Sequence, residues 1–225
     1  FVSTESFDKS YELMMSWDQL REMSGLVDVY NHSIKHLHLV DQDALTLQNE
    51  ITLAQERITK ELGIEDKFFA YPYGEFDDDT YSLLSSLGYI GFGQQSGVVS
   101  NESDFLNLPR FSMSGPYATM DSFTLKINTF HMPVDSEEPK ALVISGDFMP
   151  LLTLSFSRSL TTYEKVNFLC YVSGQDQPEL KWLSPQMLTV KSKKPLTVGR
   201  SRYNCTMPSQ EIGRYYWYSK LWLRL

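Results

Sequence analysis

The sequence predicts a mixed α/β protein in which a parallel sheet built from βα units precedes a smaller β-sandwich. In the first half, short apolar runs alternate with segments whose apolar residues recur every three or four positions, as in amphipathic helices that cover a parallel sheet. After residue 140 the pattern changes to short apolar runs separated by turns, which is typical of antiparallel strands in a sandwich. The polar stretch 131–139, which contains two prolines, is the predicted linker.

The composition of the chain limits which kinds of molecule the protein can bind. The 225 residues, 42% hydrophobic and 13% aromatic, suffice for one large or two ordinary domains. No apolar run approaches the roughly 18–20 residues that cross a membrane. The formal charge of −8 would repel nucleic acids and other anionic polymers. A neutral glycan, or one that becomes cationic on deacetylation, is compatible with it.

The helices and strands of the first half have clear boundary signals. Ser16 and Gln19 form a capping-box pattern for a short helix through about Met23. Trp17, in its first turn, is expected to pack there rather than to offer a platform for sugars. The later elements are predicted at 26–31 (strand), 43–62 (helix), 67–73 (strand), 77–87 (helix), 89–93 and 106–111 (strands) and 120–128 (helix).

Two histidines stand where the first apolar run ends. His32 and His36 are four residues apart, and the ends of strands are where α/β folds keep their chemistry. If the chain turns into a helix after His32, both imidazoles lie on one face, about 5–6 Å apart at Cβ. That spacing suits a metal, although two histidines alone serve equally well as core or surface groups.

The chain resembles the polysaccharide deacetylases of the NodB-homology type, carbohydrate esterase family 4, over roughly residues 1–130. The resemblance rests on three segments: the H-S-x-x-H element at 32–36, Phe-Ala-Tyr-Pro-Tyr-Gly at 69–74 and the opening Phe-Val-Ser-Thr. It looks closest to the branch that deacetylates poly-N-acetylglucosamine in biofilm matrices. It implies an irregular (β/α) barrel, only partly present, whose exposed sheet edge favours self-association as a homo-oligomer.

The resemblance assigns roles to several residues. His32 and His36 match two ligands of a divalent metal, usually zinc, and Ser33 matches a residue that supports their loop by hydrogen bonding. The backbone N–H of Tyr73 would donate to the oxyanion, and Pro72 would fix the turn that aims it. The family's T-F-D-D motif, which supplies the catalytic base and a third ligand, belongs before Phe1, so the isolated chain is expected to be inactive.

Departures from the family pattern leave alternatives open. Ala70 stands where many members carry an arginine, as in the biofilm-polymer branch; Arg110 is a tentative substitute, but a surface salt bridge is equally compatible. The late L-x-H motif is not found, and His131 is a poor replacement. His38 is expected to face solvent or to lie behind the metal ligands. The aspartates at 77–79 imitate an F-D-D motif, yet they are expected to cap the following helix.

The second half carries a pattern that predicts an immunoglobulin-like sandwich over 140–225. Cys170, Trp182 and a Tyr203-x-Cys205 triplet follow in the expected order, although the two cysteines are closer in sequence than usual. Their disulfide would imply an oxidising compartment, hence a secreted or periplasmic protein. In the last strand, one alternating set is expected to face the core: Tyr215, Trp217, Leu221, Leu223 and Leu225.

The predicted function is hydrolysis of N-acetyl groups on a polysaccharide containing N-acetylglucosamine, such as poly-N-acetylglucosamine, by a metal-dependent deacetylase. Peptidoglycan or chitin-like chains are an alternative substrate. A non-catalytic protein that binds glycans or matrix is the alternative function. An aspartate pair upstream in the parent gene would separate the enzyme from the binding protein.

Overall fold

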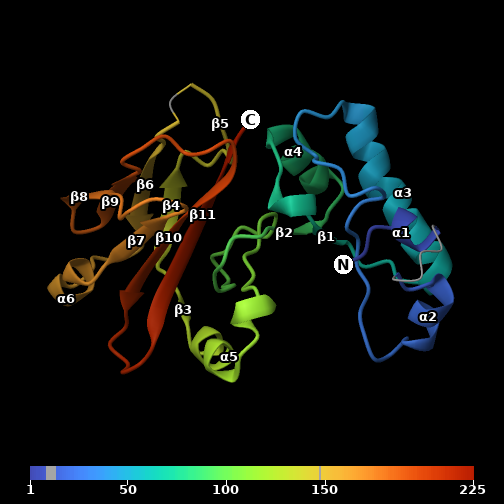
Figure 1. Ribbon diagram of the computed structural model, residues 1–225, viewed down its shortest axis with the longest axis horizontal. Coiled ribbons are helices and arrows are strands. Elements are labelled where there is room, and N and C mark those ends of the chain that lie inside the picture. The colour runs from blue at the N-terminus through green and yellow to red at the C-terminus, as the bar shows by residue number, and fades with distance from the viewer. Residues whose placement is uncertain (9–13, 147) are drawn as a thin grey trace. The chain divides into compact units, whose positions relative to one another are not determined.

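The computed structural model describes residues 1–8, 14–146 and 148–225 (Figure 1). The chain divides into two compact units. Unit 1 comprises Phe1–Gly93 and Asp104–Leu108, and unit 2 comprises Gln94–Ser103 and Pro109–Leu225. These bounds differ from the predicted domains at 1–130 and 140–225. The segment predicted as a linker, 131–139, instead contributes strands to the sheets of unit 2.

Unit 1 combines helices with short parallel segments. Its elements are α1 (Glu5–Asp8), α2 (Trp17–Glu22), α3 (Ala44–Leu62), β1 (Phe68–Ala70), the 3-10 turn η1 (Pro72–Gly74), α4 (Asp78–Ser86) and β2 (Ile90–Phe92). β1 and β2 pair in parallel. Isolated parallel bridges extend this pair, from Val2 to Asn31 and from Asn31 to Phe69 on one side, and from Phe92 to Leu108 on the other.

The predicted strands at 26–31 and 106–111 are therefore wrong as regular strands. Apart from a local bridge between Ser24 and Val27, each joins its neighbouring segments by isolated parallel bridges, at Asn31 and at Leu108 respectively. Short apolar runs show which segments enter the sheet. The number of residues that pair depends on how far the neighbouring segments run alongside them. The order of neighbours, with parallel direction throughout, agrees with the predicted βα units.

Helices α2 and α3 begin and end close to where the sequence signals predict, whereas α1 is not among the predicted helices. Ser16 and Gln19 form the capping box of α2, and Asp43 caps α3, which ends at Gly63 in the left-handed conformation. The apolar stripe of α3 is buried, as expected for a helix that covers a sheet. Trp17 is buried as well, with its ring 4.8 Å from that of Phe7, so packing is the interpretation the structure supports.

The aspartate cluster caps α4, as predicted. Asp77 Oδ1 accepts hydrogen bonds from the backbone N–H and the hydroxyl of Thr80, at 2.9 and 2.7 Å. Its other oxygen accepts the backbone N–H of Asp41 at 3.0 Å. Asp78 and Asp79 are exposed in the first turn. Asp77 thus fixes both the start of α4 and the end of the loop that follows the histidines.

Unit 2 consists mainly of two antiparallel sheets. Its elements are η2 (Gly115–Tyr117), α5 (Met120–Ile127), β3 (Phe130–His131), β4 (Val134–Glu138), β5 (Val143–Ile144), β6 (Leu151–Phe156), α6 (Thr162–Val166), β7 (Leu169–Val172), β8 (Glu179–Ser184), β9 (Met187–Lys191), β10 (Gly199–Pro208) and β11 (Tyr215–Arg224). One sheet has the order β3-β11-β10-β7, with β5 also paired to β11, and the other has the order β4-β6-β9-β8. β10 and β11 form the longest ladder (Figure 1).

The two sheets share one hydrophobic core. Leu152, Leu154 and Leu188 reach it from one sheet, and Tyr203 and Trp222 reach it from the other. All five side chains are fully buried. Two layers of sheet around a single core are the arrangement that the run of short strands predicts.

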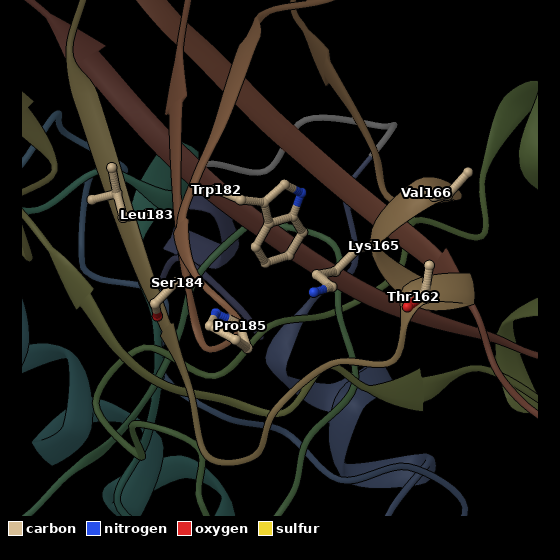
Figure 2. Close-up of a pocket in the computed structure, with 7 residues that line it drawn as sticks. All are labelled: Thr162, Lys165, Val166, Trp182, Leu183, Ser184 and Pro185. Carbon is tan, nitrogen blue, oxygen red and sulfur yellow. The ribbon is translucent and has the colours of Figure 1, made fainter.

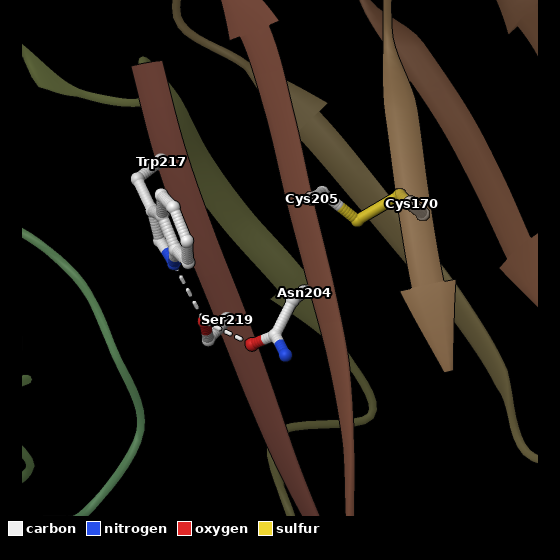
Figure 3. The surroundings of a disulfide bond; sticks show 5 residues. All are labelled: Cys170, Asn204, Cys205, Trp217 and Ser219. Carbon is white, nitrogen blue, oxygen red and sulfur yellow. Dashed lines mark hydrogen bonds between the residues drawn. A yellow bond between two sulfur atoms is a disulfide. The ribbon is translucent and has the colours of Figure 1, made fainter. Parts of the chain in front are cut away.

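The predicted disulfide between Cys170 and Cys205 is confirmed, but it does not join the two sheets. The two cysteines are directly opposite each other on neighbouring strands β7 and β10, with their Cα atoms 4.1 Å apart (Figure 3). An immunoglobulin disulfide would connect strands of different sheets. The short spacing between these cysteines is explained by this cross-strand position within one sheet.

The buried residues of β11 agree with the prediction only in part. Trp222, which is outside the predicted core-facing set, is fully buried in the core, while Tyr215 and Leu225 of that set are exposed. Leu221 and Leu223 are buried on the opposite face from Trp222. Because both faces of this part of the strand are covered, apolar character does not distinguish them.

On the face of β10 and β11 that points away from the core, three polar side chains are linked by hydrogen bonds. The indole N–H of Trp217 donates to Ser219 Oγ, which donates in turn to Asn204 Oδ1, at 3.0 and 2.6 Å (Figure 3). The Phe111 ring meets Trp217 edge to face. Satisfied polar groups and aromatic packing thus define the outward face of a strand whose amino-acid pattern is apolar on both sides.

Replacing Asp77 tests whether the acidic cluster is structural. Asp77→Ala removes an acceptor for three donors, so the free energy of unfolding should fall by about 1–2 kcal/mol in urea titrations. Asp77→Asn, which keeps an acceptor, should recover most of the loss. Asp78→Ala, at an exposed neighbour, should change it by no more than a few tenths of a kcal/mol. Equal effects at the two aspartates would contradict the capping role.

Glu164 should make the stability of unit 2 depend on pH. Bidentate pairing with Arg158, helped by the backbone and hydroxyl of Thr161, lowers the pKa of this buried carboxyl to about 2. An unfolded glutamate has a pKa near 4.3, so the stabilisation is present above pH 5 and is lost as pH falls toward 2. The difference in unfolding free energy between wild type and Glu164→Gln should shrink by up to about 3 kcal/mol over that range. Glu179→Gln, at an exposed position on β8, is the matched control and should show no such dependence.

Candidate functional site

The candidate site lies where neighbouring parallel segments of unit 1 end. Asn31 bridges Val2 on one side and Phe69 on the other, and His32 follows it immediately. β1 ends at Ala70, and the Pro72–Gly74 turn follows. The carboxyl ends of parallel segments meet at one edge of a sheet, so the histidines and the turn come together there, as in other α/β proteins.

The loop that carries the histidines is fixed to helix α3 by buried polar groups. The Asn31 side chain donates to the carbonyl of Ile51 at 2.9 Å and accepts the backbone N–H of Ser33 at 2.9 Å. Glu50, also on α3, accepts the backbone N–H groups of Ile34 and Lys35 through one carboxylate oxygen, both at 3.0 Å. A loop that would otherwise have unsatisfied donors is therefore held in one conformation.

Ser33 supports the loop, as the resemblance implies. Its side chain is buried, and its hydroxyl oxygen accepts the backbone N–H of His36 at 3.0 Å. Its carbonyl accepts the backbone N–H of Thr4, while His32 donates its backbone N–H to the carbonyl of Val2. The opening segment of the chain therefore lies alongside the first histidine.

His32 and His36 face each other at the site. Their ring centroids are 4.7 Å apart, with the rings at 77°. His32 Nδ1 lies 2.6 Å from the carbonyl oxygen of Ala70. A carbonyl only accepts, so Nδ1 carries the proton and the imidazole lone pair lies on Nε2. Metal-binding histidines are oriented in this way, by donating their other ring nitrogen to a carbonyl or carboxylate.

Tyr73 completes the arrangement from the β1 side. It has a left-handed backbone conformation, φ 59° and ψ −1°, between Pro72 and Gly74. Its ring lies 4.5 Å from that of His36, edge to face. The turn is closed by the backbone N–H of Gly74 donating to Tyr71 and that of Glu75 donating to Pro72. The structure thus places Tyr73 next to the histidine pair.

His38 lies beside the site with most of its side chain exposed, as expected, whereas sequence reasoning missed its partner Glu75. The His38 ring stacks on the Tyr73 ring at a centroid distance of 4.0 Å and an angle of 6°. Its Nδ1 donates to Glu75 Oε2 at 2.5 Å. The Glu75 side chain is only 5% exposed, whereas that of His38 is 63% exposed. A carboxylate directly after Pro-Tyr-Gly was the only available signal, and nothing in the sequence paired it with His38.

Backbone strain is concentrated here. Among the described residues, four other than glycine have positive φ: Ser33, His36, Asp41 and Tyr73. Three of these belong to the site and the fourth ends the histidine loop. Such conformations cost about 1–3 kcal/mol each and persist only where the surroundings enforce them, most often at functional sites. The hydrogen bonds of Asn31 and Glu50 supply that enforcement.

The metal-ligand set is incomplete within the described residues. Nowhere in residues 1–8, 14–146 and 148–225 do three or more histidine, cysteine, aspartate or glutamate side chains gather in a manner that could hold a metal ion. Arg110 belongs to unit 2, where its backbone N–H donates to Gln95 and burial lowers the pKa of its guanidinium. Its part in catalysis stays a prediction. His131 forms part of β3 in unit 2.

Unit 2 has a pocket of its own, of about 380 Å³, between α6 and the end of β8. Figure 2 shows Trp182 and Lys165 among its seven lining residues, with the hydroxyls of Thr162 and Ser184 beside them. The Trp182 ring packs inward on Phe156 and Phe168. None of the lining side chains is a carboxylate or an imidazole, so the pocket offers surface for binding but no acid–base pair.

Comparison with known proteins finds a match to a family model in the first part of the chain. Residues 1–92 match the sequence model of the family described as polysaccharide deacetylase. The resemblance inferred from the three sequence segments is therefore confirmed for this part of the chain.

Several solved deacetylase structures align with part of this chain. The Streptococcus pyogenes deacetylase PplD in complex with acetate is 20% identical, with a TM-score of 0.52 over 56% of each chain. The BpsB deacetylase domain from Bordetella bronchiseptica is 20% identical, with a TM-score of 0.43 over 48% of this chain and 58% of the other. A de-N-acetylase from Aggregatibacter actinomycetemcomitans is 18% identical, with a TM-score of 0.41 over 54% and 62%. The chain thus spans little more than half the length of these structures.

Glu50 offers a direct test of how the histidine loop is held. Glu50→Ala leaves the backbone N–H groups of Ile34 and Lys35 without their acceptor, so the free energy of unfolding should fall by about 1.5–3 kcal/mol in urea titrations. Glu50→Gln keeps one acceptor oxygen and should lose less. Glu56→Ala, at an exposed position of the same helix, should stay within about 0.5 kcal/mol of wild type. A loss no larger than that of the control would show that the loop does not depend on this carboxylate.

Proposed function

We propose that this chain, whose residues 1–92 are related to the polysaccharide deacetylases, carries part of the active site of a metal-dependent polysaccharide N-deacetylase. The observation that carries the proposal is the pair His32 and His36 beside the strained turn at Tyr73. The reaction is hydrolysis of the N-acetyl groups of a glycan that contains N-acetylglucosamine. Poly-N-acetylglucosamine is the substrate that the sequence resemblance favours.

The residues present fit two positions of a divalent metal site. The hydrogen bond from His32 Nδ1 to the Ala70 carbonyl leaves Nε2 as the atom that would bind the metal. His36 lies close enough to bind the same metal ion. Imidazole ligands suit zinc and several other divalent ions, with zinc the first choice here. A bound metal would supply an activated water for attack on the amide. The described residues do not supply the remaining ligand and the base, which the resemblance assigns to an aspartate pair.

The protein itself would stabilise the negative charge that develops on the acetyl oxygen during hydrolysis. We assign this to the backbone N–H of Tyr73, held by the left-handed conformation of the turn. Pro72 restricts the turn on one side, because its ring fixes φ. Donors that are oriented before the substrate arrives stabilise a tetrahedral intermediate at little cost of reorganisation.

The surroundings agree with an extracellular glycan as substrate. The disulfide in unit 2 supports a secreted or periplasmic location. The chain's net charge of −8 suits a neutral polymer whose deacetylated product is cationic. No helix among the described residues has the length and apolar character needed to cross a bilayer.

A non-catalytic glycan-binding role is the second candidate. One observation favours it: the unit 2 pocket presents an indole, two hydroxyls and an ammonium group, which together suit a sugar ring. This role needs neither the aspartate pair nor the histidine pair, so activity measurements separate the two candidates.

The proposed function predicts acetate release by the full-length gene product, including whatever precedes this sequence, from poly-N-acetylglucosamine oligomers. A chelator should abolish release, and adding zinc or another divalent ion should restore it. His32→Ala should reduce release to background because the metal loses one of its ligands. His131→Ala, in unit 2, is the matched histidine control and should retain activity.

The alternatives give different results in the same experiment. If acetate is released only from chitin or peptidoglycan fragments, those polymers are the substrate. No release from any of the three by a folded, metal-loaded protein that still binds oligomers would replace the enzyme by the glycan-binding role. Release that survives both chelation and His32→Ala would rule out the assigned metal pair.

A further inference from the structure

We propose that Glu75 and His38 are positioning residues that hold the Tyr73 turn in its working conformation. The inference rests on the proposed function, in which the Tyr73 backbone N–H donates to the oxyanion. It adds two residues to the site that the sequence resemblance does not supply. It concerns unit 1 alone.

The geometry points to a continuous row of rings anchored at both ends. His32 donates to the Ala70 carbonyl at one end, and His38 donates to the Glu75 carboxylate at the other. Between them lie His36 and Tyr73. Successive centroid distances from His32 to His38 are 4.7, 4.5 and 4.0 Å. Rings in contact at these distances restrict one another's rotation.

The two ends of this row come from different segments. Glu75 belongs to the Tyr73 turn, since its backbone N–H donates to Pro72 at 3.1 Å. His38 belongs to the histidine loop. Asp77, the N-cap of α4, holds this loop by accepting the backbone N–H of Asp41, and the carbonyl of Leu39 shares the Thr80 hydroxyl with Asp77. The bond between Glu75 and His38 therefore joins the turn to the loop. It does so beside Tyr73, one of the residues with positive φ.

Tyr73 needs such restraint. Its φ of 59° is sterically unfavourable for a residue with a side chain, so the turn would relax if its surroundings allowed. The stacked His38 ring covers the Tyr73 side chain, and the Glu75 carboxylate keeps the His38 ring in place although most of the His38 side chain is exposed. Relaxation of the turn would redirect the Tyr73 N–H away from the oxyanion, and small displacements of this kind reduce rates strongly.

The stacking of the His38 ring on the Tyr73 ring can be tested without measuring enzymatic activity. In ¹H–¹³C spectra of the histidine-labelled protein, stacking on Tyr73 should move the His38 ring protons upfield. Tyr73→Leu should abolish that displacement, and so should Glu75→Ala. Glu75→Gln, whose amide oxygen still accepts from Nδ1, should keep it. A His38 signal that is the same in wild type and Tyr73→Leu would overturn the stack on which the inference depends.

The positioning role is tested by steady-state kinetics of acetate release by the full-length gene product. Glu75→Ala and His38→Ala should each lower kcat by about 10- to 100-fold with KM changed less than about twofold. The double variant should lose no more than the larger single loss, because both residues act through one contact. Glu75→Gln should return kcat to within about threefold of wild type. Glu61→Ala, which removes ion pairs with Arg21 and Arg57, is the control and should leave kcat unchanged.

Each outcome decides the inference. Equal loss in Glu75→Gln and Glu75→Ala would mean that the charge matters rather than the hydrogen bond, and would overturn positioning. Additive losses in the double variant, or a rise in KM alone, would overturn it too. If Glu75→Ala fails to fold, His38→Ala and Glu75→Gln suffice. Absence of release by wild type would count against the proposed function, and the spectra would still decide whether the Glu75–His38 pair holds Tyr73.

Discussion

The site depends first on one buried amide, the side chain of Asn31. Asn31 is the residue at which the segment before the histidines enters the parallel array, and its side chain binds both helix α3 and the start of the loop. A fully buried polar group must find partners in its own structure, so its hydrogen bonds allow one arrangement of helix, sheet edge and loop. Without the Asn31 side chain, the backbone that leads into His32 would have no fixed direction.

Strain and hydrogen bonding are balanced in the same few residues. Ser33, His36 and Tyr73 have backbone conformations that residues with side chains avoid. The carboxylates of Glu50 and Glu75, the hydroxyl of Ser33 and the carbonyl of Ala70 hold the loop, the turn and the rings by hydrogen bonds. The folded unit thus offsets local strain with nearly complete satisfaction of buried polar groups. This balance keeps two imidazoles and a turn within contact of one another.

Unit 2 is stabilised by different means. Its core is formed by residues from both sheets, and the disulfide reinforces one pair of neighbouring strands within a single sheet. Thr161 and Glu164 form the capping box that begins α6, and Arg158 pairs with the same Glu164 carboxylate. None of these features resembles an acid–base site. The histidine pair and the Tyr73 turn both belong to unit 1, and unit 2 has the pocket beside Trp182.

The amino-acid sequence determined the features that depend on neighbours along the chain. Helices α2, α3, α4 and α5 begin and end close to their predicted bounds because caps and apolar spacing are local. The H-S-x-x-H and Pro-Tyr-Gly segments marked the site for the same reason. Tertiary structure decided what depends on distant partners. The buried face of β11, the sheet position of the disulfide, the role of 131–139 and the contact between His38 and Glu75 are all set by residues far apart in sequence. A period of two shows that a strand has two faces, but only the packing of other elements decides which face, or both, is buried.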